Sequence, residues 1–538
     1  MFEEEGGGPE AGRAEESVRS WWRGVVEDQP RDPEPVHPSL CPEIDCVRHL
    51  LPVGVAEAAE ACSIHLGVGA ERVLITSGHL KEDTYLAALA TSLGIEFETF
   101  EHTERAACPL AGPRLLDAAR AGLLPLSVAG VLVWVIAPRR TTARTLIALL
   151  RRDPELSARL RLTSSEHMRS FVARHSAREI ARGAVAGLNP ELSAGTRRRL
   201  SARQIGAGMV VAGAAAWWPT VALNVLGYAL GLVFLTWILF RLFGVLARPP
   251  QPSPGWRIAD DRLPIYTILV PLFQEAPSLP GLIKALRQLD YPAEKLDIKL
   301  VIEPNDTVTR SAIERMQLAA PFEIVTAPAA GPRTKPKALN AALLLAHGTF
   351  TAIYDAEDRP ESNQLRHALD AFLGGDDDLA CVQARLTIDN TEDSWLARLF
   401  TAEYAGLFDV FLPAIAARRL PIPLGGSSNH FRTDALKKVG GWDPYNVTED
   451  ADLGIRFARL GYRTTVIAST TYEEAPARLD AWLTQRTRWF KGWMRPVNLI
   501  KSIVTSIGYR RNFFMNEIIA TTSQQIRPAQ RHVRRQMI

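Results

Sequence analysis

The chain has 538 residues, enough for about three domains of ordinary size. With 47% hydrophobic and 22% charged residues it is expected to be mainly globular, and a net charge of only +3 argues against a nucleic-acid partner. Its five cysteines have no CxxC spacing, which predicts reduced thiols rather than a disulfide framework or a zinc site.

The first 40 residues begin MFEEEGGGPEAGRAEE, an acidic, apolar-poor stretch that predicts a disordered tail and not a signal peptide. Residues 41–190 are then expected to form a soluble α+β domain. Leucines recur near helical spacing within Val73–Phe97, and Leu123–Pro138 predicts two strands joined by a turn at Ala129-Gly130. A helix is predicted from about Ser164, with Ser164 or Ser165 as its cap.

Residues 70–185 resemble the N-terminal domain of type II secretion and pilus-assembly ATPases. The resemblance implies a docking or regulatory domain, with a polysaccharide-export or regulatory protein as its partner. Some members bind cyclic di-GMP through an Arg-Leu-Gly opening and a later Gln. Here His65-Leu66-Gly67 and Ser92 occupy those places, so docking is the expected role. The chain has no GxxxxGK[ST] loop, which argues against a secretion ATPase.

Residues 205–247 form an apolar stretch interrupted by one charge, Arg241. One spanning helix needs roughly 20 residues, so this length predicts two transmembrane helices with a turn near Pro219 or Asn224. Arginines flank both ends, which favours an even number of crossings with both flanks cytoplasmic. The alternative is a buried helix pair in a soluble core, which is rarely apolar on every face over such a length.

After a proline-rich linker, Arg248–Trp256, strand and helix patterns alternate over residues 260–495. Four buried strands are predicted, at Ile265–Val270, Lys299–Glu303, Phe322–Ala327 and Thr349–Asp355. The alternation indicates an α/β domain with a mainly parallel, doubly wound sheet and helices on both faces. Ligands of such sheets lie beyond the carboxyl ends of the strands.

The run Asp355-Ala356-Glu357-Asp358 places three acids on a tight turn at the end of one predicted strand. Carboxylate oxygens are the ligands preferred by Mg²⁺ and Mn²⁺, and such a cation commonly neutralises a diphosphate leaving group. The run is therefore a candidate metal site, with a solvated acidic turn as the alternative.

Other candidate residues lie at the ends of neighbouring strands. Glu303 and Asp306 follow one strand and Glu275 follows another, where a carboxylate can accept hydrogen bonds from a base or ribose. Lys335 and Lys337 precede a helix, where cations can meet phosphate oxygens. The alternative for the two lysines is an exposed basic loop.

Two later motifs complete the candidate site. In Thr448-Glu449-Asp450 the threonine is a possible helix cap and Asp450 a possible general base, provided that burial or nearby carboxylates raise its pKa. A predicted helix carries Gln485, Arg486, Arg488 and Trp489 in the pattern Gln-x-x-Arg-Trp. An arginine there could reach a pyrophosphate and the Trp489 ring could stack on a sugar; a membrane-surface helix is the alternative.

Residues 265–494, with these ordered motifs, resemble the catalytic domain of family 2 glycosyltransferases, in particular the cellulose-synthase-like processive branch. The resemblance implies a GT-A-type fold beside a transmembrane hairpin, a nucleotide-sugar donor (UDP-linked in the family), a glycan acceptor and inversion. It implies a multi-pass protein of the inner membrane, with the lipid bilayer as a partner and the catalytic domain cytoplasmic.

By position, the resemblance assigns metal and diphosphate binding to Asp355 and Glu357, with Asp358 as a competitor. It makes Asp450, beside Glu449, the catalytic base, and gives the nucleotide role to Asp306 or Glu303. The remaining assignments fall on the acceptor and diphosphate side: Gln485, Arg488, Trp489, Gln383 and the loop Gly425–Asn429.

Processive members continue past the tryptophan motif with more spanning helices, whereas residues 496–538 here form a basic tail without an apolar spanning segment. A truncated tail is one reading of this difference. Two alternatives to polymer synthesis therefore remain: a transferase that adds one sugar to a lipid or protein, and an inactive regulatory or scaffold protein of the membrane.

Overall fold

The computed structural model describes residues 41–52, 54–138, 141–190, 192–195, 202–246 and 258–493. The predicted disordered tail, the proline-rich linker and the predicted basic tail lie outside these ranges.

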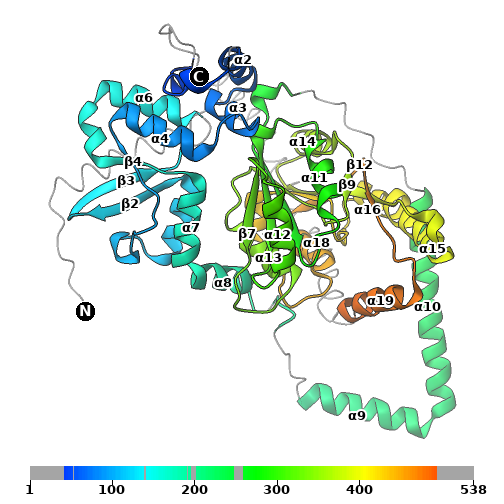
Figure 1. Ribbon diagram of the computed structural model, residues 1–538. Coiled ribbons are helices and arrows are strands. Elements are labelled where there is room, and N and C mark those ends of the chain that lie inside the picture. Colours follow the sequence, from blue (N-terminus) through cyan, green and yellow to red (C-terminus); the bar gives the residue numbers. More distant parts are fainter. Residues whose placement is uncertain are drawn as a thin grey trace, which may run out of the picture.

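The N-terminal unit is a four-stranded sheet covered by helices, in the strand order β1-β4-β3-β2 (Figure 1). The strands β2 and β3 form an antiparallel hairpin, and Ala129 and Gly130 have the positive φ angles that a two-residue turn needs, so the predicted turn is confirmed. Ser164 caps α7 by accepting a hydrogen bond from His167 N at 3.3 Å, as predicted. Its elements are β1 (Glu96–Phe97), β2 (Leu123–Val128), β3 (Val131–Ile136), β4 (Leu160–Leu162), α2 (Val55–Leu66), α3 (Ala70–Thr76), α4 (Glu82–Leu93), α5 (Gly112–Ala121), α6 (Thr142–Arg152), α7 (Ser165–His175) and α8 (Ala177–Ala186).

The apolar stretch forms two helices, α9 (Ala202–Trp217) and α10 (Pro219–Leu246), which meet where the turn at Pro219 was predicted. Proline suits the first turn of α10, where its missing N–H has no helical partner. Within the part of the chain that the structure describes, α10 contains a window long and apolar enough to cross a membrane, Pro219–Thr236, and none of that window is buried in the protein. The second such segment is Trp395–Ala417, which is 44% buried.

The predicted pair of transmembrane helices stays a prediction, which the described residues support only weakly. Within the described residues α9 has 16 residues, about 24 Å at 1.5 Å per residue, which is short of a bilayer core of about 30 Å. In Figure 1 α9 and α10 meet at a wide bend and do not run side by side. The two apolar segments that the structure does offer, α10 and Trp395–Ala417, are weak support for membrane association by length and composition alone.

The C-terminal unit is built on an eight-stranded mixed sheet in the order β7-β6-β5-β8-β11-β10-β12-β9. Its first four strands are parallel, as predicted, whereas β11 runs antiparallel to both neighbours. The four predicted strands are confirmed as β5 (Tyr266–Leu272), β6 (Leu296–Ile302), β7 (Phe322–Thr326) and β8 (Phe350–Ile353). The others are β9 (Arg359–Pro360), β10 (Leu379–Ile388), β11 (Asn429–Arg432) and β12 (Arg463–Glu473).

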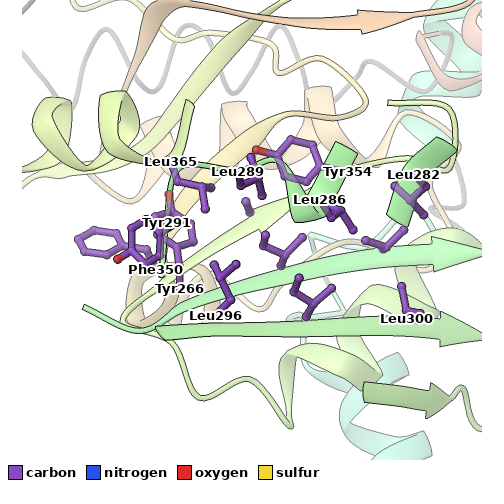
Figure 2. Close-up of a cluster of buried hydrophobic side chains, with 14 of the residues drawn as sticks. Tyr266, Leu282, Leu286, Leu289, Tyr291, Leu296, Leu300, Phe350, Tyr354 and Leu365 are labelled. Atoms are coloured by element: carbon purple, nitrogen blue, oxygen red, sulfur yellow. The ribbon is translucent and has the colours of Figure 1, made fainter. Parts of the chain in front are cut away.

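Successive residues of the central strands enter separate cores on the two faces of this sheet. Ile268 and Val270 lie in the cluster under α11 and α14, drawn in part in Figure 2, while Leu269 lies in the cluster under α13 and α18. Burial on both faces explains the nearly continuous apolar runs of the sequence. The helices are α11 (Leu279–Arg287), α12 (Thr307–Arg315), α13 (Lys335–Leu343), α14 (Gln364–Leu373), α15 (Trp395–Tyr404), α16 (Leu412–Ala417), α17 (Thr433–Lys438), α18 (Glu449–Arg459) and α19 (Leu479–Trp493).

Candidate active site

A lysine and an aspartate lie together at the carboxyl edge of the sheet. Asp355 follows β8, and its two carboxylate oxygens lie 2.7 and 2.9 Å from Nζ of Lys335, the first residue of α13. The same ammonium group donates to the carbonyl oxygen of Gly426 at 2.8 Å. Strand β8, helix α13 and the loop before β11 therefore meet at Lys335.

The acidic pair Glu449-Asp450 belongs to the same site as Lys335 and Asp355. Glu449 and Asp450 are buried in the first turn of α18. Burial and the neighbouring Glu449 raise the pKa of Asp450 well above its usual value, and the charge of Asp355 adds to the rise. A β-carbon added to Gly426 would lie 3.9 Å from Oδ2 of Asp450. Acids that are nearly a hundred residues apart in the sequence thus share one electrostatic site.

Negative charge exceeds positive charge in this site. Although burial alone would lower it, the carboxylates of Asp355, Asp450 and Glu449 raise the pKa of Lys335. Burial also raises the pKa of Glu449, with a further rise from Asp355, while Lys335 and Arg488 oppose it. One lysine is therefore shared among several acids.

Two more acids border the cluster. Desolvation, and then the charges of Asp355 and Glu275, raise the pKa of Glu357. Burial raises the pKa of Glu473, at the end of β12, to about 7, with contributions from Asp355 and Glu357 and an opposing hydrogen bond from Tyr404. Such a concentration of carboxylates is suited to a bound cation or a cationic partner.

A divalent cation fits part of this set. Asp355 and Glu357 offer hard carboxylate oxygens in a region with excess negative charge, which is what Mg²⁺ and Mn²⁺ require. Asp358 differs, because its buried side chain accepts the Asp355 N–H at 2.7 Å and so builds the turn. The described ranges contain no group of three or more His, Cys, Asp or Glu arranged for a metal ion. The metal ligands stay a prediction, and Asp358 differs from Asp355 and Glu357 in that it also supports the turn.

The acids of the earlier strands hold the loops in place. Asp306 caps the N-terminus of α12 by accepting the Thr309 N–H at 3.1 Å, and its other oxygen accepts the Gln274 N–H at 2.6 Å. Glu275 accepts a hydrogen bond from Ser278 at 3.0 Å. Its charge contributes to the raised pKa of Glu357.

Glu303 and Lys337 form a buried ion pair at 3.3 Å, and the lysine also donates to the carbonyl of Pro328. The predicted phosphate contact of Lys337 is corrected by this placement, because its ammonium group points into the protein.

Gln383 supports the loop rather than facing an acceptor. Its side chain is fully buried, accepts the Gly425 N–H at 2.7 Å and donates to the carbonyl of Ser427 at 3.1 Å. These bonds shape the segment that presents the Gly426 carbonyl to Lys335.

Two arginines of α19 have different surroundings: Arg486 contacts α15, and Arg488 is exposed. Arg486 forms a bidentate ion pair with Glu403 of α15, and its guanidinium group stacks 4.6 Å from the ring centre of Trp489 and 4.9 Å from that of Phe400. Arg486 is thus occupied in docking α19 against α15, which corrects its predicted role with phosphate. Arg488 is exposed and its charge acts on Glu449.

The other two residues of the tryptophan motif, Gln485 and Trp489, are partly buried on α19. The Gln485 side-chain oxygen is buried without a hydrogen-bond partner in the described structure. Trp489 is half-buried against Phe400, with their ring centres 6.1 Å apart.

The predicted cap on α18 is wrong: the Thr448 hydroxyl contacts Asn446 at 3.3 Å and makes no bond to the helix N–H groups.

Sequence reasoning missed two side chains of the site. Glu473 follows a polar strand, and its only sequence signal is an acid at a strand end. Trp442 is fully buried. Its indole N–H opposes the rise in the pKa of Asp450, although the two groups form no hydrogen bond in the described structure.

The model of a family described as Glycosyl transferase family group 2 matches residues 350–524. Over 250 residues the chain is 27% identical to a probable glycosyltransferase, YdaM, of Bacillus subtilis, covering 44% of this chain and 57% of that protein. Over 266 residues it is 25% identical to glucomannan 4-beta-mannosyltransferase 1 of Oryza sativa, covering 48% of this chain and 50% of that protein. The chain spans about half the length of the curated relatives it matches.

Among solved structures, the chain is similar to the mannosyltransferase PcManGT from Pyrobaculum calidifontis in complex with GDP-Man and Mn²⁺. That match has a TM-score of 0.37 and 23% identity, and covers 49% of this chain and 70% of the other. The predicted resemblance of residues 70–185 to secretion ATPases lies outside the family match and stays a prediction. The matched segment begins at β8 and includes Asp355, Asp450 and the tryptophan motif, so these candidate site residues lie in the part of the chain that is similar to family group 2 glycosyltransferases.

Proposed function

We propose that this domain transfers a sugar from a nucleotide-diphosphate donor to the hydroxyl of a glycan acceptor, with inversion at the anomeric carbon. The observation that carries the proposal is the meeting of Lys335, Asp355, Glu449 and Asp450 at one edge of the sheet. It brings a cation for a diphosphate and a carboxylate of raised pKa into the same site.

In the proposed step Asp450 accepts the proton of the acceptor hydroxyl while that oxygen forms its bond to the anomeric carbon. The bond from this carbon to the diphosphate oxygen breaks, and the nucleoside diphosphate leaves from the opposite face. Burial and Glu449 make Asp450 a stronger base than an exposed aspartate, whose pKa is ~3.9. Glu449 thereby assists catalysis by its charge.

Lys335 and Arg488 are proposed to bind the oxygens of the donor diphosphate. Asp355 and Glu357 would hold Mg²⁺ or Mn²⁺, which when bound offsets diphosphate charge. Trp489 and Gln485 are proposed to line the acceptor path, since α19 borders the site. Most of the rate acceleration would come from positioning and charge neutralisation.

The relatives guide the choice of donor and acceptor. Several are plant glucomannan 4-beta-mannosyltransferases. We therefore propose a polysaccharide acceptor and place GDP-mannose beside the UDP-sugars as a donor to test.

Membrane anchoring is part of the proposal. The exposed apolar side chains of α10 favour burial in lipid, and the basic residues around the apolar stretch favour a cytoplasmic catalytic domain. We propose attachment to the inner membrane, with the bilayer as a partner and more than one crossing as the finer expectation.

The test incubates membranes containing the full chain with a panel of labelled nucleotide sugars, with Mg²⁺, with Mn²⁺ or with EDTA, followed by sizing of the products. We expect one donor to give a long labelled glycan that needs the cation. Single-sugar products would replace polymer synthesis by transfer to a lipid or protein. Absence of turnover with every donor would contradict the proposal and favour the scaffold alternative.

A further inference from the structure

The N-terminal unit docks directly on the helix that carries Lys335. Helix α8 packs against α13, and the two lie next to each other in Figure 1. Ala341 of α13 is fully buried in a core cluster that otherwise belongs to the N-terminal unit and includes Ala184. A β-carbon on Gly183 would come within 2.9 Å of Leu344, so the helices approach closely there. The site and the N-terminal unit therefore share one helix.

Asn340, in the middle of α13, joins three segments. Its side-chain nitrogen donates to the carbonyl of Ala184 in α8 at 2.9 Å and to the carbonyl of Trp442 at 2.7 Å. Its oxygen accepts the Trp442 N–H at 2.9 Å. The residue is buried, so an unmet bond here has a substantial cost.

The segment that follows α8 forms hydrogen bonds to Asp443, the residue after Trp442. The Ser193 hydroxyl donates to one carboxylate oxygen at 2.9 Å, and the Ala194 N–H donates to the other at 2.5 Å. Gly440 has a φ of +85°, and a β-carbon there would lie 2.9 Å from the carbonyl of Gly187. The turn at 440–443 is thus built against the N-terminal unit.

This turn leads to the proposed base. Trp442 is fully buried, with its ring edge-on to Phe431 at 5.8 Å. From the same turn the chain reaches α18, which begins at Glu449. Asn340 and Ser193 therefore hold Trp442 and Asp443 in the turn that leads to the helix of Asp450.

We infer that the N-terminal unit completes the active site, and that Asn340 and Asp443 are positioning residues that set Trp442 and Asp450 relative to Lys335. The inference rests on the proposed transferase function. Without the contacts of the N-terminal unit, the turn at 440–443 becomes more mobile, and Asp450 loses its alignment with the acceptor hydroxyl. Donor binding, which uses Lys335 and Arg488, is less affected.

The test compares two variants of the full chain that each remove one hydroxyl from the same type of bond between the two units. Ser193→Ala removes the bond to Asp443, while Thr76→Val removes the bond of Thr76 to Glu294, which is 2.8 Å long and lies at η6 (Ala293–Lys295), away from the turn. A hydrogen bond of about 1 kcal/mol corresponds to roughly a fivefold change in rate. We expect kcat to fall by about that factor in Ser193→Ala, with the donor KM unchanged.

Three further results are expected. Thr76→Val keeps the wild-type kcat, Ser193→Thr restores it because the hydroxyl returns, and Asn340→Ala lowers it further than Ser193→Ala. Equal losses in Ser193→Ala and Thr76→Val, or no loss in Ser193→Ala and Asn340→Ala, would overturn the inference.

A second measurement is independent of activity. Amide hydrogen exchange over residues 441–452 is expected to quicken in Ser193→Ala and to stay unchanged in Thr76→Val. If the wild-type chain transfers no sugar, the proposed function fails, and the exchange rates still decide whether Ser193 holds this turn. Unchanged exchange in Ser193→Ala would contradict the positioning role.

Discussion

Lys335 is the residue on which the acids of the site converge. It contacts Asp355 and the Gly426 carbonyl and interacts with Glu449 and Asp450. Burial, and then the neighbouring acids, raise the pKa values of Glu449 and Asp450, and each raised pKa records a free energy that favours protonation in the folded protein. In the proposed complex, a donor with its metal ion changes this balance.

Glu473 gives a pH-dependent prediction. Burial raises its pKa to about 7, so the folded state holds its proton more tightly than the unfolded state does. Stability is therefore lost as the pH rises from the unfolded pKa, ~4.3, towards 7, and above that the buried charge exerts its full cost. Glu473→Gln should raise the unfolding temperature at pH 8, with a gain of about 2–4 kcal/mol, and should change it little at pH 4.

The matched control for this measurement is Glu474→Gln, since the neighbouring side chain is 61% exposed. We expect no pH-dependent gain in that variant. A gain of equal size in both variants, or a gain in Glu473→Gln that is larger at pH 4, would show that Glu473 carries no buried charge.

The sequence locates these residues more reliably than it assigns their tasks. Asp355 and Asp450 could be identified because acids at a strand end and in a first helical turn have a clear pattern. Lys335 and Lys337 look equivalent in the sequence, but α13 begins at Lys335, so the two side chains leave the helix in different directions and only one reaches the site.

At the scale of elements, an ion pair and ring contacts of Arg486 hold α19 against α15. Arg486 pairs with Glu403 and stacks among Phe400, Trp482 and Trp489. Glu403→Gln keeps the shape of the side chain and removes its charge. We expect faster amide exchange across residues 479–493 and a transfer rate lowered by about tenfold, because a charge-assisted bond contributes about 1.5–3 kcal/mol.

Glu392→Gln is the control for this variant, because Glu392 pairs with Arg398 on the exposed side of the same region. Its exchange rates and its activity should match the wild type. If Glu403→Gln also matches the wild type, the ion pair does not dock α19.

Elements were predictable where one pattern determined them. The strands β5 to β8 are short apolar runs, and the β2–β3 turn carries Gly130 at a positive φ. The pattern of residues 205–247 gives apolar length but no angle, so the bend between α9 and α10 could not be predicted. The segment Trp395–Ala417 was overlooked as an apolar segment because Arg398, Glu403 and Asp409 interrupt it.

At the scale of the molecule, a docked N-terminal unit and an exposed apolar helix flank one catalytic sheet. The apolar helix predicts attachment to lipid. Charged residues at the centre of a spanning helix cost about 2.5–3.5 kcal/mol each. The double variant Leu230→Lys, Phe234→Lys alters two exposed α10 side chains and should therefore shift the protein from the membrane pellet to the carbonate-soluble fraction.

The control places the same two charges on exposed apolar residues of the N-terminal unit, in Leu50→Lys, Ile64→Lys. That protein should remain in the membrane fraction. Equal fractionation of both double variants would contradict a role of α10 in anchoring.

The central claim is that Asp450 acts as the base in a site assembled around Lys335 and Asp355, and the comparison of Asp450→Asn with Asp370→Asn tests it most directly. Asp370 is another buried aspartate, on α14, apart from the site. With the donor identified from the panel, Asp450→Asn should bind it with wild-type affinity and lose at least about 10²-fold in transfer rate, the typical contribution of a general base. Asp370→Asn should transfer at the wild-type rate. Undiminished transfer by Asp450→Asn would contradict the account.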